Sequence, residues 1–120
     1  KDITPIFTDR ADPVCIFEGF MDFLSFLSMK EEFTNHCLVM NSVSSVARSI
    51  RYLNERQVFS ICTFFDNDEA GNRATNEVKQ LNPHVEDYRT LYQNYKDLND
   101  FIMSEPICYD ISAKSTHCLQ

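Results

Sequence analysis

The feature that most constrains the fold is an apolar run without polar alternation, VFSICTFF at 58–65. A strand with one face in water alternates apolar and polar residues, whereas a strand covered on both faces does not. This run therefore predicts a strand in a mainly parallel sheet that helices cover on both sides. Two similar runs precede it, VCIFE at 14–18 and HCLVM at 36–40.

Segments with helical spacing of apolar residues follow these runs. They predict a first helix over 22–33 and a short final helix over 98–103. Two further helices are predicted between them, one after Asn41-Ser42 with the apolar face Val46, Ala47, Ile50 and Leu53, and one with the apolar stripe Ala70, Ala74, Val78 and Leu81. A weaker fourth strand is predicted at 85–92. Strand–helix alternation with short connections is typical of α/β folds. We expect a Rossmann-like arrangement of about four mainly parallel strands flanked by helices.

The chain of 120 residues has the length of one domain. Residues 1–13 are polar with two prolines and read as a lead-in, residues 14–104 hold the domain, and residues 105–120 form a polar tail. The sequence begins with Lys rather than Met, so we expect it to be part of a longer parent protein.

The location of the protein is constrained by two further features. No apolar run reaches about 18 residues, so we expect no membrane partner. The five cysteines show no CxxC spacing and favour reduced thiols in a cytoplasmic protein.

The charge balance limits how the protein meets nucleic acid. With 11 basic and 18 acidic residues, the net charge of −7 argues against a surface that grips a phosphate backbone by itself. If the substrate is nucleic acid, metal ions or other domains of the parent protein must supply positive charge.

Acidic residues gather where the predicted strands end. Glu18 closes the first strand, Asp66 and Asp68 close the third, and Asp97 with Asp100 follows the fourth. Ligands of open α/β sheets bind beyond the carboxyl ends of the strands. Oxygen ligands without His or Cys suit Mg²⁺ or Mn²⁺. The ordinary alternative for Asp68 is a helix cap.

Three segments resemble the signature segments of the TOPRIM domain: EGFMD (18–22), FFDNDEAGNRA (64–74) and YKDLNDF (95–101). This domain is shared by bacterial DnaG-type primases, phage primase-helicases, type IA and II topoisomerases and some nucleases. The resemblance covers about residues 12–104 and leans toward the primases. The third segment departs from the family pattern, because Asn99 stands where a further acid is usual and Asp100 comes next.

The resemblance implies roles for individual residues. Glu18, Asp66 and Asp68 would be catalytic, with Glu18 as acid/base or metal ligand, and Asp66, Asp68 and Asp97 would bind the metal. Asp22 matches the final acid of the first segment, and a helix cap is its expected job. Weaker substrate or phosphate contacts are assigned to Gly19, Asn41, Ser42, Lys96, Asn99 and Asp100.

The implied activity is Mg²⁺-dependent nucleotidyl transfer for RNA primer synthesis on a DNA template, the reaction of a DNA-directed RNA polymerase. The DNA template and nucleotides would be bound through the parent protein, with zinc-binding and helicase domains in the same chain or complex. The fragment alone is expected to be inactive or weak.

Other functions stay open. One is DNA cleavage of the nuclease or topoisomerase type, and another is a non-catalytic metal- or nucleic-acid-binding module of a mobile-element or phage protein. Phosphatase and receiver domains fit poorly, because DNDEA lacks the Thr that they place two positions after the second Asp.

Overall fold

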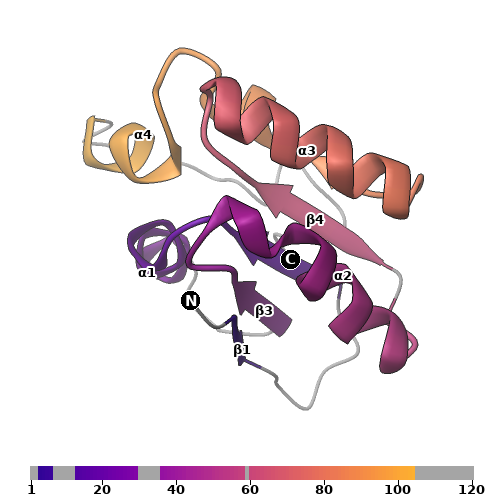
Figure 1. Cartoon of the computed structure of the whole chain (residues 1–120). Helices are drawn as coiled ribbons and strands as arrows, with labels where there is room; N and C mark the ends of the chain where they lie inside the picture. Colours follow the sequence, from indigo (N-terminus) through magenta and orange to yellow (C-terminus); the bar gives the residue numbers. More distant parts are fainter. Residues whose placement is uncertain (1–2, 7–12, 30–35, 59, 105–120) are drawn as a thin grey trace.

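The fold is built on a five-stranded sheet with the strand order β1-β3-β2-β4-β5 (Figure 1). The computed structural model describes residues 3–6, 13–29, 36–58 and 60–104. The strands are β1 (Thr4–Ile6), β2 (Val14–Phe17), β3 (His36–Val39), β4 (Ile61–Phe64) and β5 (Glu86–Asp87). All neighbouring pairs are parallel except β1 and β3, which are antiparallel. The predicted α/β fold with a mainly parallel sheet is confirmed.

The three central strands end in register. Phe17 at the end of β2 pairs with Val39 of β3 and with Phe64 of β4. All residues of β2 and β4 are buried, as the apolar runs predict. Residues that follow these strands therefore emerge side by side at one edge of the sheet, which we call the carboxyl edge.

In the described part of the chain, four α-helices cover the sheet: α1 (Phe20–Ser28), α2 (Val46–Glu55), α3 (Glu69–Leu81) and α4 (Leu98–Ser104). Helix α1 packs against α4, and α2 packs against α3. The two pairs cover opposite faces of the sheet, and each has its own core (Figure 1). Phe17 and Phe64 stack at 5.1 Å between ring centroids beneath α1 and α4.

The prediction of a fourth strand over 85–92 is wrong for most of this range. Only Glu86 and Asp87 pair with β4, and the chain then turns into the 3₁₀ helix η2 (Arg89–Tyr92). Asp87 accepts hydrogen bonds from the backbone N–H and the guanidinium of Arg89, which favours this turn over a longer strand. Tyr92 is fully buried and ends η2 inside the core.

Other predictions need smaller corrections. The first helix begins at Phe20 and ends at Ser28, and Phe33 lies outside the described residues. Part of the expected lead-in forms β1. Ala47 is exposed and Leu81 is 47% exposed, so both lie outside the buried stripes of their helices.

The expectations about the cysteines and about membrane-spanning segments can also be compared with the structure. Cys62 is disulfide-bonded, so the expectation of reduced thiols is wrong for this residue. Among the described residues, every helix is too short or too polar to cross a membrane.

Gly71 sets how closely α3 approaches the end of β4. A Cβ atom at this position would lie 1.9 Å from the carbonyl oxygen of Asp66, a clash with backbone. At Gly19, in contrast, a Cβ atom would meet nothing within 4 Å. Packing therefore requires glycine at position 71, beside Asp66, and does not require it at position 19, beside Glu18.

We predict that Gly71→Ala destabilises the protein by about 1–3 kcal/mol, the usual cost of overpacking. The matched variant Gly19→Ala should cost at most about 1 kcal/mol, because its Cβ enters open space. Urea unfolding measures both. Equal stability of the two variants would contradict this account of Gly71.

Candidate metal centre at the carboxyl edge

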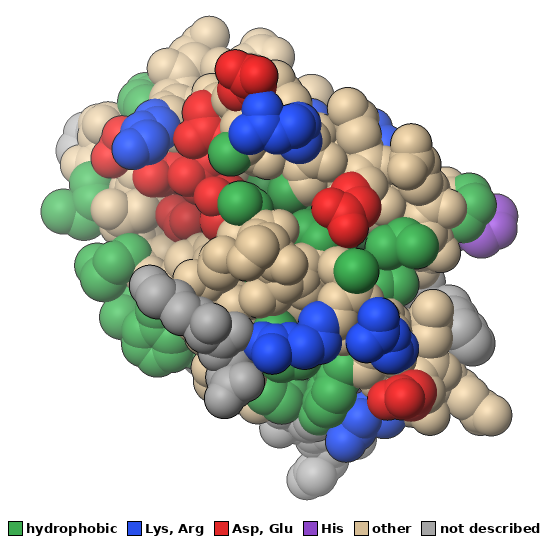
Figure 2. Space-filling model, in the orientation of Figure 1, with side chains coloured by type: hydrophobic (Ala, Val, Ile, Leu, Met, Phe, Trp, Pro, Cys, Tyr) green, Lys and Arg blue, Asp and Glu red, His purple; other side chains and the backbone are tan. Residues whose placement is uncertain are grey.

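Three carboxylates from three elements converge at the carboxyl edge. One oxygen each of Asp22, Asp66 and Asp97 lies within 4.8 Å of the other two. Asp22 is the third residue of α1, Asp66 follows β4 by two residues, and Asp97 directly precedes α4. Acidic side chains gather in a hollow between α1, α4 and the start of α3 (Figure 2). We call Asp22, Asp66 and Asp97 the carboxylate trio.

Glu18 stands beside the trio. It directly follows β2, and its Oε2 accepts a hydrogen bond of 3.0 Å from the backbone N–H of Asp66. Burial is the largest cause that raises the pKa of Glu18, and the negative charges of Asp68 and Asp97 raise it further. The hydrogen bond from Asp66 works in the opposite direction. Glu18 thus fixes the backbone of one trio member and adds a fourth carboxylate to the region.

Asp68 lies outside the trio. It is exposed, and its Oδ1 accepts a 2.7 Å hydrogen bond from the N–H of Gly71, which makes it the N-cap of α3. An N-cap carboxylate also interacts favourably with the helix dipole. Its charge still reaches the site, because it contributes to the raised pKa values of Glu18 and Asp66.

Asp22 was expected to cap a helix, whereas the structure groups its carboxylate with those of Asp66 and Asp97. It is only 6% exposed, and its Oδ1 accepts a 3.0 Å hydrogen bond from the N–H of Asn99 in α4. It therefore binds the first turn of α4 while it faces the other two carboxylates. The available signal was its place as the final acid of the EGFMD segment. Ser25 also points to α4 and donates to Oδ1 of Asn99 at 2.6 Å.

The residues of the third segment have defined structural roles. Oδ1 of Asp97 accepts a 2.8 Å hydrogen bond from the N–H of Asp100, so Asp97 also holds the start of α4. The side-chain oxygen of Asn99 accepts the hydrogen bond from the hydroxyl of Ser25. Lys96 is exposed, and its carbonyl oxygen accepts a 2.7 Å hydrogen bond from the N–H of Asn67.

The residues assigned to weaker substrate contacts near α1 and β3 serve local structure. Asn41 follows β3 with a φ of 65° and donates to Oγ1 of Thr4 at 3.1 Å. Ser42 caps the 3₁₀ helix η1 (Val43–Ser45) by accepting from the N–H of Ser44. Gly19 is the N-cap of α1. The contacts described for Asn41, Ser42 and Gly19 are therefore made outside the carboxylate trio.

The electrostatics of the trio disfavour full ionisation. Burial is the largest cause that raises the pKa of Asp66 to about 7, and the charges of Glu18, Asp22, Asp97 and Asp68 add to it. Burial likewise raises the pKa of Asp22 to about 6, against a hydrogen bond from Asn99. The neighbouring charges that shift the pKa values of Asp22 and Asp66 all belong to carboxylates. Oxygen-only donors fit a hard divalent cation such as Mg²⁺ or Mn²⁺.

We predict that metal-free protein loses stability as the pH rises from about 4 to about 7. Both folded-state pKa values lie above the ordinary value of 3.8, so the folded state binds more protons than the unfolded state in this window. In EDTA at pH 8, Asp66→Asn should therefore be more stable than wild type, on the order of 1 kcal/mol after discounting for partial exposure.

The difference should shrink at pH 4.5, where the carboxyl of wild-type Asp66 is neutral. Glu77→Gln, an exposed change on α3, controls for the loss of a carboxylate alone. Thermal unfolding at both pH values measures the effect. Wild type that is as stable as Asp66→Asn at pH 8 would contradict the electrostatic account.

Comparison with solved structures finds the same fold. The primase fragment of the bacteriophage T7 primase-helicase protein gives a TM-score of 0.63 at 21% identity, over 80% of this chain and 40% of that one. A small TOPRIM domain protein from Bacillus stearothermophilus gives 0.60 at 22% identity, over 78% and 80% of the two chains. This chain thus spans less than half the length of the T7 primase fragment.

A third similar structure holds bacteriophage T7 lagging-strand DNA polymerase interacting with primase domains bound to an RNA/DNA hybrid and dTTP. Its TM-score is 0.53 at 18% identity, over 77% of this chain and 52% of that one. No curated protein matches the sequence. A family model described as Toprim-like matches residues 15–102, which run from within β2 to within α4 and include the whole carboxylate trio. The chain belongs to the Toprim-like family.

Proposed function

We propose that the carboxylate trio, with Glu18 beside it, binds Mg²⁺ or Mn²⁺ and that the chain is the catalytic domain of a primase-type nucleotidyltransferase. The observation that carries this proposal is the convergence of three carboxylate oxygens within 4.8 Å, from segments far apart in the sequence. Mutual repulsion among these like charges lowers the stability of the domain, and a bound divalent cation would relieve it.

The trio would hold the cation through Asp22, Asp66 and Asp97. When bound, the cation supplies electrostatic stabilisation of the phosphate charge that develops during transfer. Asp68 would act at one remove, because it caps α3 and adds negative charge at the same edge. This assignment adds Asp22 to the expected ligands and gives Asp68 a supporting role.

Glu18 is the group best placed to move a proton. Burial raises the pKa of this carboxyl toward neutral pH, and a general acid or base is most effective when its pKa lies near the working pH. Its Oε2 is oriented by the N–H of Asp66, so the carboxyl is held beside this member of the trio. We assign Glu18 the removal of the proton from the attacking hydroxyl of the primer.

The substrates would be a DNA template and nucleotides that other parts of a longer protein help to bind. The net charge of −7 leaves this domain without enough positive charge to hold a phosphate backbone alone. Basic, zinc-binding or helicase domains in the same chain or complex would supply the rest. Two of the similar structures contain primase domains, which makes primer synthesis the first activity to test. The shared fold alone does not separate it from the cleavage chemistry of other TOPRIM proteins.

The test is primer synthesis by the full-length protein on single-stranded DNA with Mg²⁺ and labelled nucleotides. Glu18→Gln and Asp66→Asn should each lower the yield of RNA primer by about 100-fold or more, as expected when a proton-transfer group or a metal ligand is lost. Glu77→Gln should leave the yield unchanged.

Primer synthesis that survives both site variants would overturn the proposed mechanism. Cleavage of the template in place of synthesis, lost in the same variants, would assign the trio to nuclease chemistry instead.

A further inference from the structure

We infer that Asn67, the middle residue of the DND sequence, is a positioning residue that fixes Asp97 in the carboxylate trio. This inference rests on the proposed function, because it assigns a role toward the same cation. Its hydrogen bonds lead to the segment that precedes Asp97.

Asn67 donates three hydrogen bonds to one short segment. Its side-chain Nδ2 donates to the carbonyl oxygens of Tyr92 and Tyr95, both at 2.9 Å. Its backbone N–H donates to the carbonyl oxygen of Lys96 at 2.7 Å. The last of these acceptors belongs to the residue directly before Asp97. Asn67 is itself the residue directly after Asp66, so its bonds join the neighbours of two trio members.

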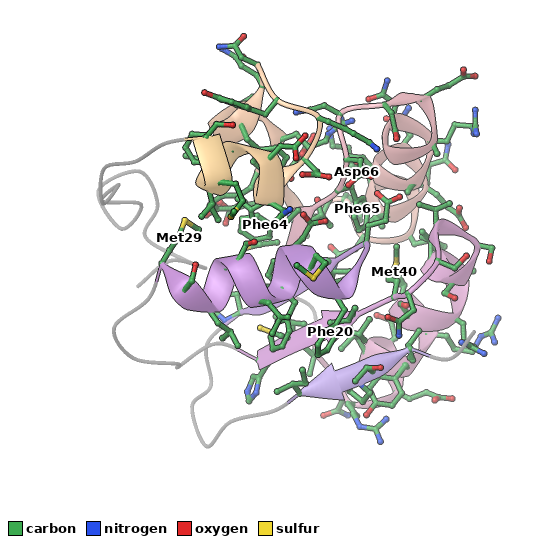
Figure 3. The ribbon with its side chains drawn as sticks, turned by 90° about the vertical axis from the view of Figure 1, so that its left-hand side faces the viewer. Phe20, Met29, Met40, Phe64, Phe65 and Asp66 are labelled. Carbon is green, nitrogen blue, oxygen red and sulfur yellow. The ribbon has the colours of Figure 1, made fainter. Side chains whose placement is uncertain are left out.

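The segment that carries Asp97 needs such an attachment. Residues 93–97 lie between η2 and α4 and form neither helix nor strand. A fourth bond reinforces the connection, because the buried hydroxyl of Tyr92 donates to the carbonyl oxygen of Phe65 at 2.8 Å. We call the bonds from residues 65–67 to residues 92–96 the clasp. Asp66 lies at the end of β4, between α3 and α4 (Figure 3).

The clasp depends on the amide of Asn67. A primary amide offers two N–H donors, and both are used on carbonyl oxygens. A carboxylate of the same shape would face those carbonyls with acceptors only and would add charge beside the trio. Asn67→Asp is therefore an isosteric change that should open the clasp, and Asn67→Ala removes the donors without adding charge.

The first test measures Mn²⁺ affinity from the electron paramagnetic resonance signal of free Mn²⁺. Asn67→Ala should raise the dissociation constant about 10-fold or more, as is usual when a partner of a metal ligand is lost. The same change in an Asp97→Asn background should have little further effect, because Asn67 acts through Asp97. Val78→Ala, in the core under α2 and α3, controls for lost stability and should leave the affinity unchanged.

A second readout does not depend on metal. In EDTA, amide hydrogen exchange across residues 93–97 should be faster in Asn67→Ala than in wild type and in Val78→Ala. Exchange that is unchanged would overturn the clasp. An affinity loss that is equally large in the Asp97→Asn background would overturn the role through Asp97. Faster exchange in a protein whose wild type binds no Mn²⁺ would support the clasp and overturn the proposed metal function.

Discussion

Electrostatic repulsion among carboxylates that the fold holds together is the constraint on which the rest of this structure depends. Two unit charges 4.8 Å apart repel each other by about 3 kcal/mol at an effective dielectric constant of about 20. A domain is typically stable by only about 5–15 kcal/mol in total. The fold offsets this repulsion with two apolar cores, one on each face of the sheet, and a proton or a cation at the carboxyl edge relieves it.

The DNDEAG sequence at 66–71 places several residues with different structural roles next to one another. Asp66 joins the carboxylate trio, Asn67 binds the segment before Asp97, and Asp68 caps α3. Gly71 lets the first turn of α3 approach the carbonyl of Asp66. The side chains of the three neighbouring residues Asp66, Asn67 and Asp68 therefore have three different surroundings. The motif organises the local structure as well as the candidate site.

Much of the fold could be predicted from the sequence, because it depends on local patterns. The apolar runs at β2, β3 and β4 predict buried strands, and their common direction brings Glu18 and Asp66 to one edge. β1 and β5 were harder to predict, since they are short edge strands. Their pairing depends on contacts with distant residues. The polar composition of residues 1–13 gave no signal for β1.

The site could be predicted only in part, for the same reason. Asp66 follows from its place after β4. Asp97 was expected after a longer fourth strand, whereas it lies between η2 and α4. Asp22 lies within a helix and joins the trio only because α1 packs against α4. Asp68 has the spacing of a ligand but the geometry of an N-cap, and the sequence pattern suits both. Asn67 gave no signal, since its partners are backbone carbonyls 25 and 28 residues away.

The most direct measurement is an anomalous difference map from crystals of the domain grown with Mn²⁺. This account predicts a peak bounded by carboxylate oxygens of Asp22, Asp66 and Asp97, with Glu18 beside it. A fully occupied Mn²⁺ ion elsewhere on the molecule, or no ion at the carboxyl edge at saturating concentration, would contradict it.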